Sequence, residues 1–258
     1  GNSIHKDLHL GNVLQSKDRY SFISDFGSCK PADETDTKKI YGVMPYMAPE
    51  ILRGKEYTQK SDVYSLGIII NEIISIIPPF NDEPHDYYLA LDICRGNRPK
   101  IRDETPDFLK ELIQKCWDAN PENRPTSKEV FDNFVSHVYV DNQSSEEIQY
   151  SKYSKQVEEL KELTYNFTPI TKSTTKTQLY ETHTQAIYTS RLLNFSNLPE
   201  PVNCSNQKEF ISSRNTAANA YTSECLGCII TDLNKLDFYA KSNCIWYMVN
   251  LSNLNSLF

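Results

Sequence analysis

The strongest constraint on the fold of this 258-residue chain is a long apolar run at residues 63–77. Isoleucine occupies positions 68, 69, 70, 73, 74, 76 and 77, so apolar side chains would point in nearly every direction around a helix. Ser61 and Asp62 offer an N-cap in front of this run, and Pro78 and Pro79 stop the helix. A helix that is apolar nearly all round belongs in the middle of a protein core.

The neighbouring sequence predicts a mainly α-helical domain over residues 1–138. Further helices are expected at about 86–95, 106–118 and 126–138, where apolar residues recur at helical spacing. The only clear sheet signal is a pair of short apolar runs, Val13–Gln15 and 20–24, joined by a polar stretch typical of a small hairpin.

Residues 139–258 differ in character from the preceding part. Ser, Thr, Asn and Tyr dominate, and helical periodicity is weak. We expect a polar, partly disordered and largely irregular extension there, with one charged helix near 146–163.

Composition excludes some partners and locations. The net charge of −7 is spread along the chain, so we expect no nucleic acid partner. The most apolar run, from Leu66 to Phe80, is broken by Asn71 and Glu72 and is shorter than the ~20 apolar residues that cross a bilayer, so we expect no membrane partner. Seven scattered cysteines do not form a secreted disulfide framework and indicate a reducing, cytoplasmic location.

One cysteine pair raises a zinc alternative. Cys225 and Cys228 have the spacing of two metal ligands, but a tetrahedral site needs four. Only Cys204, Cys244 and the distant His183 remain to complete it. Unpaired thiols are the simpler interpretation.

Three short motifs follow one another in a fixed order near the N-terminal end. His5-x-Asp7-x-x-x-x-Asn12 supplies a carboxylate and a carboxamide from one loop in front of a strand. Phosphoryl transfer needs one group that orients the attacking hydroxyl and accepts its proton, and another that holds magnesium. Asp7 and Asn12 suit those roles.

The other two motifs are Asp25-Phe26-Gly27, directly after the second strand, and Ala48-Pro49-Glu50. A carboxylate at a strand end can bind a metal that bridges phosphates, and Gly27 permits a backbone conformation that other residues resist. Each motif alone is weak, since a lone Asp in a loop is usually a turn or cap residue. Their order, spacing and strand context together are specific.

On these motifs, residues 3–138 resemble the eukaryotic protein kinase family. The resemblance implies the C-lobe of the α+β kinase fold, with ATP and Mg²⁺ as cofactors and a protein substrate. The run from Ser61 to Gly67 and the segment from Trp117 to Thr126 extend the match. The first of these runs, together with Cys116–Trp117, is most similar to the tyrosine-kinase-like branch.

The resemblance also assigns roles to individual residues. Asp7 is implied as the base, and His5 and His9 are grouped with it as catalytic residues. Asn12, Asp25 and Gly27 are implied in cofactor binding, with Asn12 and Asp25 as the metal ligands. Structural support is implied for Asp62, which would hydrogen-bond the catalytic-loop backbone, and for Glu50 and Arg124, which would form a buried ion pair.

Several positions depart from the family pattern. Lys6 replaces the usual Arg beside the catalytic Asp and offers only a point charge. His9 and Gly11 stand where kinases usually place a Lys or an Arg that neutralises the transferred group. A protonated His9 could substitute in part, or it could simply pack against the activation segment, which runs from Asp25 to Glu50. Val43 replaces an expected Thr, so the acceptor class stays open, with serine or threonine favoured over tyrosine.

A glycine-rich phosphate loop, a strand lysine and an adenine-binding hinge are not found in the chain. We therefore predict a kinase fragment that requires an upstream N-lobe for activity and is inactive alone. If about four isoleucines of the 63–77 helix lose their partner in such a fragment, the loss is ~6–12 kcal/mol. The alternative is a pseudokinase or kinase-like interaction module without catalytic activity.

Overall fold

The structure is a computed structural model, and it describes residues 3–15, 21–28, 30–31, 40–138 and 180–218. Its α-helices are α1 (Pro49–Leu52), α2 (Gln59–Ser75), α3 (Tyr87–Cys94), α4 (Asp107–Cys116), α5 (Ser127–Val138) and α7 (Ser213–Ala218). Single turns of 3₁₀ helix lie at Leu10–Asn12, Phe26–Ser28, Met44–Tyr46, Pro121–Asn123 and Gln207–Glu209. The predicted helices at 86–95, 106–118 and 126–138 are thus present.

The helix predicted from the apolar run is α2, but it begins earlier than expected. Thr58, and not Ser61 or Asp62, is its N-cap: the Thr58 side chain accepts the Ser61 N–H, and the Ser61 hydroxyl accepts the Thr58 N–H at 3.1 Å. Helical geometry ends at Ser75, because Ile76 takes a left-handed backbone conformation before the prolines are reached. Because Thr58 caps the helix, the Asp62 carboxylate can accept hydrogen bonds from His5 and Lys6 instead.

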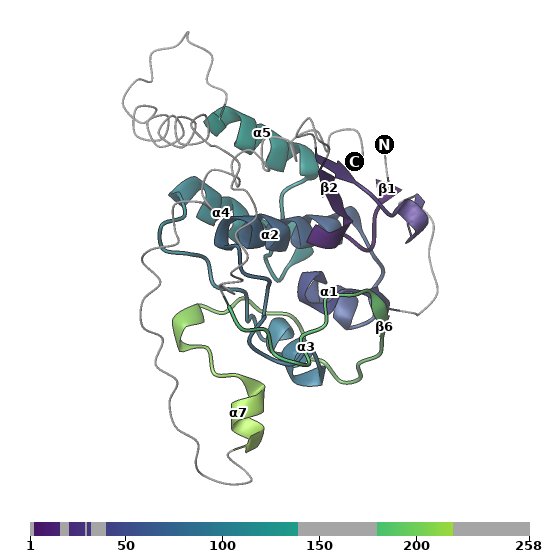
Figure 1. The fold of residues 1–258 in the computed structure, drawn as a ribbon, viewed down its shortest axis with the longest axis vertical. Helices are drawn as coiled ribbons and strands as arrows, with labels where there is room; N and C mark the ends of the chain where they lie inside the picture. Colours follow the sequence, from purple (N-terminus) through teal and green to yellow (C-terminus); the bar gives the residue numbers. More distant parts are fainter. Residues whose placement is uncertain (1–2, 16–20, 29, 32–39, 139–179, 219–258) are drawn as a thin grey trace, which may run out of the picture.

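The apolar face of α2 is buried on nearly all sides. The helix packs against α4 at the centre of the domain (Figure 1). Ile68, Ile69, Ile70 and Ile73 are at most 8% exposed. These four isoleucines keep their partners, so the condition for the loss of ~6–12 kcal/mol is not met.

Three small antiparallel strand pairs complete the described part. β2 (Val13–Gln15) pairs with β3 (Ser21–Ile23), which is the predicted hairpin. Two pairs were not predicted: β1 (Ser3–Ile4) with β4 (Lys30–Pro31), and β5 (Ile40–Gly42) with β6 (Arg191–Leu193). Their strands are short and pair residues far apart in the chain, so they lack the adjacent second run that marks a hairpin in the sequence.

Residues 180–218 lie against the helical domain and are called the wrapping segment below. It carries β6 beside α1, runs past α3 and ends in α7 (Figure 1). Its Leu193 and Leu198 side chains join the hydrophobic core. This part of the predicted irregular extension thus has a definite place, whereas the predicted helix near 146–163 lies outside the described residues.

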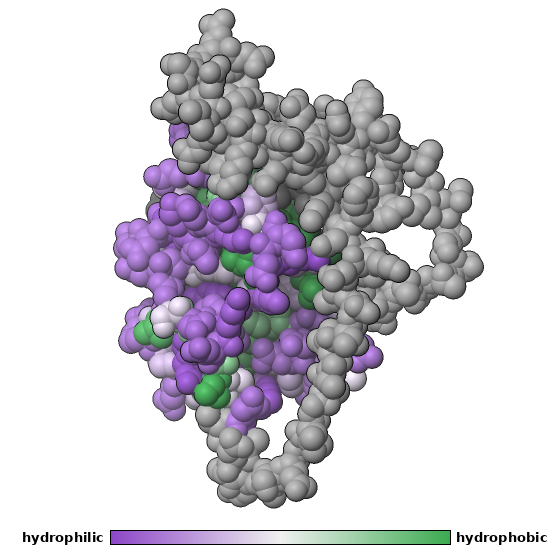
Figure 2. All heavy atoms as spheres, turned by 90° about the vertical axis from the view of Figure 1, so that its left-hand side faces the viewer, coloured by the Kyte–Doolittle hydropathy of each residue, from purple (hydrophilic) through white to green (hydrophobic). Residues whose placement is uncertain are grey.

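The outer surface beside α4 and α7 is mainly hydrophilic, with small scattered hydrophobic patches (Figure 2). None of the described helices is both long and apolar enough to cross a membrane.

Candidate active site

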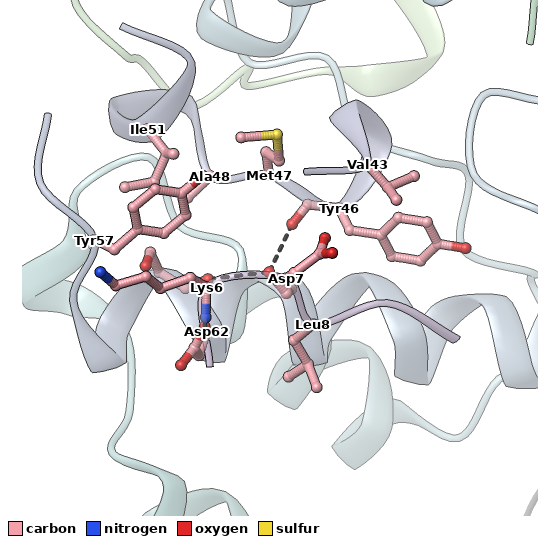
Figure 3. Close-up of a pocket in the computed structure, with 12 residues that line it drawn as sticks. Lys6, Asp7, Leu8, Val43, Tyr46, Met47, Ala48, Ile51, Tyr57 and Asp62 are labelled. Atoms are coloured by element: carbon pink, nitrogen blue, oxygen red, sulfur yellow. Dashed lines mark hydrogen bonds between the residues drawn. The ribbon is translucent and has the colours of Figure 1, made fainter. Parts of the chain in front are cut away.

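Asp62 of α2 holds the catalytic loop by its backbone. Its two carboxylate oxygens accept the N–H groups of His5 at 2.6 Å and Lys6 at 3.1 Å. Figure 3 shows Asp62 beneath the loop, with residues of the activation segment on the opposite side of the pocket. Burial raises the pKa of Asp62 to about 7, and the two N–H donors oppose that rise. The Lys6 backbone has a positive φ of 71°, so the loop turns sharply at this contact.

Asn12 connects the catalytic loop to the end of β3. Its side-chain amide donates to the backbone oxygen of Asp7 at 2.9 Å. Its backbone oxygen accepts both the N–H of Ser24 at 2.8 Å and the Ser24 hydroxyl at 3.0 Å. Asp7, Asn12 and the residue after Ser24, which is Asp25, are therefore held in one local framework.

The Asp25-Phe26-Gly27 motif packs on His5. The Phe26 ring meets the His5 ring edge-on with centroids 5.5 Å apart, and His5 Nε2 lies 3.0 Å from the Ser24 carbonyl oxygen. The left-handed backbone conformation belongs to Asp25, at φ 61°. The conformational reason predicted for Gly27 is therefore wrong: a Cβ there would instead lie 3.3 Å from the Asp25 carboxylate.

The donor set of Asn12 and Asp25 suits magnesium. A carboxylate and a carboxamide oxygen are hard ligands of the kind that Mg²⁺ prefers, with phosphate and water oxygens filling its other positions. The Asn12 nitrogen is engaged by Asp7, which leaves the Asn12 side-chain oxygen to face a ligand. The residues present thus fit this ion.

His9 has the surroundings of a neutral packing residue. Its Nδ1 accepts the N–H of Gly11 at 3.1 Å, and its ring lies 5.9 Å from that of Tyr46 in the activation segment. Burial lowers the pKa of His9, although the Asp7 carboxylate 4.0 Å away opposes that shift. These contacts favour the second alternative, packing against the activation segment.

Glu50 and Arg124 form a two-pronged ion pair. The two Arg124 nitrogens donate to the two Glu50 oxygens at 2.6 and 2.8 Å, and the Arg124 side chain is 0% exposed. Arg124 also donates to the carbonyl oxygens of Lys60 at 3.0 Å and Asp118 at 2.8 Å. The pair therefore joins α1, at the end of the activation segment, to the start of α2 and the segment after α4.

The activation segment is also held to α2 through Tyr46. The Tyr46 hydroxyl donates to Glu72 at 2.6 Å, and the Ser65 hydroxyl donates to the Tyr46 carbonyl oxygen at 2.7 Å. Burial raises the pKa of Glu72 to about 7, opposed by the Tyr46 hydrogen bond. Helix α2 thus positions both the loop at residues 5–12 and the activation segment.

Comparison with known families agrees with this arrangement. The family model described as "Protein kinase domain" matches residues 2–140. The chain belongs to the protein kinase family. Members of this family use ATP and usually a divalent metal ion, so the fit of Asn12 and Asp25 to magnesium has a functional context.

Curated relatives of this kinase domain include proteins from amoebae and plants. Dual specificity protein kinase shkE of Dictyostelium discoideum is 41% identical over 137 residues, covering 50% of this chain and 19% of that protein. Dual specificity protein kinase shkA of the same organism is 36% identical over 141 residues, covering 52% and 26%. A "Protein kinase and PP2C-like domain-containing protein" of Oryza sativa subsp. japonica is 32% identical over 162 residues, covering 49% and 25%. The chain thus spans about a quarter or less of these relatives.

Sequence reasoning missed one residue at the centre of this kinase site. Ser190, far along the chain in the wrapping segment, donates a short hydrogen bond from its hydroxyl to Asp7 Oδ2. The only local sign is the short run of strand-forming residues near Tyr188–Leu193, which nothing in the sequence connects to the catalytic loop.

The zinc alternative has no support in the described part of the kinase. Cys204 is a free, partly exposed thiol, and His183 Nδ1 accepts the N–H of Gln185 at 3.1 Å. Within the described ranges no group of three or more His, Cys, Asp or Glu side chains could hold a metal. Cys225, Cys228 and Cys244 lie outside those ranges.

Proposed function

We propose that this chain is the C-lobe of a kinase that transfers the terminal phosphoryl group of ATP to a protein hydroxyl, serine or threonine in preference to tyrosine. The observation that carries the proposal is the single framework joining Asp7, Asn12 and Asp25. Asn12 donates to Asp7 and accepts from Ser24, so the proposed base and both proposed metal ligands keep a fixed relation. Phosphoryl transfer depends chiefly on such positioning.

Each residue of the framework has a separate role in this proposal. Asp7 accepts the proton of the acceptor hydroxyl while the oxygen attacks phosphorus. Asn12 and Asp25 would hold Mg²⁺, which when bound neutralises charge on the phosphates. Asp62 and the Glu50–Arg124 pair keep the loop and the activation segment in place.

The proposal includes the tyrosine-kinase-like branch and a requirement for an N-lobe. The runs Ser61–Gly67 and Cys116–Trp117 support the tyrosine-kinase-like branch, because they are most similar to its pattern. The N-lobe motifs that grip ATP are not found in residues 1–258, so activity is proposed to need an upstream lobe in the full-length protein. A cytoplasmic location remains part of the proposal.

A pseudokinase is the second candidate, and one observation favours it. His9, at a position where kinases usually carry a cation, is partly buried with a lowered pKa and accepts a backbone N–H. A neutral imidazole cannot neutralise a transferred phosphoryl group. The substitutions at Lys6 and Val43 point the same way.

Phosphate incorporation decides between the two candidates. The full-length protein, with Mg-ATP and casein as a generic acceptor, should phosphorylate casein, and Asp25→Ala and Asp7→Asn should each lower the rate by at least about 100-fold. Asp103→Ala, in an exposed loop, is the matched control and should keep wild-type activity. Absence of incorporation by correctly folded wild-type protein would instead establish the pseudokinase.

A further inference from the structure

The wrapping segment adds a strand to the activation segment beside Asp7. β6 pairs antiparallel with β5 of the activation segment, with Gly42 opposite Arg191 and Ile40 opposite Leu193. Adding a strand to an exposed edge is a general way to bind an extended peptide. The pairing brings Ser190, the residue before β6, to the catalytic carboxylate.

The contact at Ser190 has the geometry of a nucleophile with its base. The Ser190 hydroxyl donates to Asp7 Oδ2, and the Asp7 side chain is only 9% exposed. A Cβ added to Gly42 would lie 3.5 Å from Asp7 Oδ1, so the strand pair passes directly beside this carboxylate. Thr189, the neighbouring hydroxyl residue, is exposed and has no such contact in the described structure.

The segment is anchored on both sides of Ser190. Before it, the His85 N–H donates to the Gln185 carbonyl oxygen at 3.0 Å, and the Tyr188 hydroxyl donates to the Pro79 carbonyl oxygen at 3.0 Å. After it, Arg191 donates to the His85 carbonyl oxygen at 2.5 Å, and Leu193 is 7% exposed within the core. These contacts hold the hydroxyl in place without any contribution from a separate protein.

We propose that Ser190 is an intramolecular phosphorylation site of this kinase; the inference rests on the proposed function. In the step, the Ser190 oxygen attacks the γ-phosphorus of Mg-ATP, and a new O–P bond forms as the bond from phosphorus to the β,γ-bridging oxygen breaks. The hydroxyl proton passes to Asp7 Oδ2, and ADP leaves. The product carries about −1.5 to −2 charge beside the Asp7 carboxylate, so repulsion then drives the segment out of the site.

Phosphosite mapping of the full-length protein after incubation with Mg-ATP tests the proposal. One phosphate per molecule is expected on Ser190, with a first-order rate that is unchanged over a 100-fold dilution of the enzyme. Ser190→Ala should remove this phosphate, and Thr189→Ala should retain it. A rate proportional to enzyme concentration, or labelling of an Asp25→Ala protein by the Ser190→Ala enzyme, would overturn the intramolecular step.

A second pair of variants tests the docking. Leu193→Asp places a charge in the core and should slow Ser190 phosphorylation at least about 10-fold. Leu192 lies on the opposite face of β6 and is 60% exposed, so Leu192→Asp should stay within about twofold of wild type. Equal rates for the two variants would contradict substrate-like docking.

Casein phosphorylation by the same preparations separates the two proposals. Labelled casein with unmodified Ser190 would refute the assignment of Ser190 and leave the kinase function standing. If neither casein nor Ser190 is labelled, both proposals fail.

Discussion

Backbone N–H and C=O groups find their hydrogen-bond partners in different ways in two regions, the helical domain at residues 40–138 and the wrapping segment at 180–218. In the domain, helices such as α2 and α4 pair most of their own N–H and C=O groups and bury apolar faces against one another. In the segment, backbone groups bond to the domain. The His183 N–H donates to the Asn81 carbonyl oxygen at 2.8 Å, and the Val202 N–H donates to the Cys94 carbonyl oxygen at 3.0 Å. The domain specifies its own structure, whereas the segment takes its structure from the surface beneath it.

The two regions should therefore respond differently to substitution, and Arg124→Ala should have the largest effect. It leaves Glu50 without its partner and removes a side chain that is 0% exposed. We expect a loss of about 3–5 kcal/mol in the free energy of unfolding of the full-length protein, measured by urea denaturation. Lys128→Ala, which breaks an exposed pair with Asp132, is the control and should change that energy by less than about 0.5 kcal/mol. Similar losses for the two variants would show that the core does not depend on the buried pair.

Asp62→Ala should come next. It removes the acceptor of the His5 and Lys6 N–H groups. Leaving one such buried N–H group without an acceptor costs about 1–3 kcal/mol. We expect faster hydrogen exchange at these two amides and a loss of about 2–4 kcal/mol in stability. Asp62→Asn keeps one acceptor oxygen and should lose about half as much. If exchange rises equally at the Ser213 amide of the wrapping segment, the two regions are not independent.

Gly96→Ala should act on the segment. Gly96 has φ +96°, and a Cβ there would lie 2.4 Å from the Cys204 nitrogen and 2.7 Å from the Val202 oxygen. We expect a loss of about 2–3 kcal/mol, with faster exchange at the Val202 amide. Gly54→Ala is the matched control, because Gly54 has φ +82° with nothing within 4 Å of an added Cβ, and it should cost only about 1 kcal/mol. If Val202 exchange is unchanged in Gly96→Ala, the docking of the segment does not depend on the close approach at Gly96.

Acidification should give the smallest effect. His85 accepts the Ile187 N–H on Nδ1 at 2.9 Å, and its Nε2 lies 3.0 Å from the Phe80 carbonyl oxygen. Burial lowers the pKa of His85 below 6.5. The backbone contacts with Ile187 and Phe80 oppose this shift, Arg191 lowers the pKa further and Asp86 raises it. Docking of the segment is therefore complete above pH 6.5 and weakens as the pH falls, because the released His85 takes up a proton.

Hydrogen exchange at Ile187 between pH 7.5 and 5.5, corrected for the intrinsic rate, measures this effect. The opening equilibrium should rise by up to about tenfold per pH unit. His85→Asn keeps an acceptor near the position of Nδ1 without titrating in this range, so its opening should not vary with pH. A pH dependence that persists in His85→Asn would assign the effect to another group.

The helical domain could largely be predicted because its information is local. Apolar spacing located α2, α3, α4 and α5, but it placed the start of α2 too late. Thr58 was missed because its box partner is Ser61 and not the Glu or Gln that usually marks this cap. The central position of this helix was predicted correctly, as the burial of Ile68–Ile70 shows, but how many isoleucines keep a partner could not be predicted, since the number of neighbours around a helix is a property of the packed domain.

The residues proposed for catalysis could be named from the sequence because they sit in short motifs. Asp7 and Asn12 come from one loop, and Asp25 follows a strand whose pairing fixes its distance from that loop. The sequence by itself thus determined the family resemblance, the helices and the residues proposed for catalysis. Only the tertiary structure decided that Ser190 reaches Asp7 and that residues 180–218 wrap the domain. The physical reason is that those contacts join residues far apart in the chain, through backbone groups and single side chains that leave no periodic pattern.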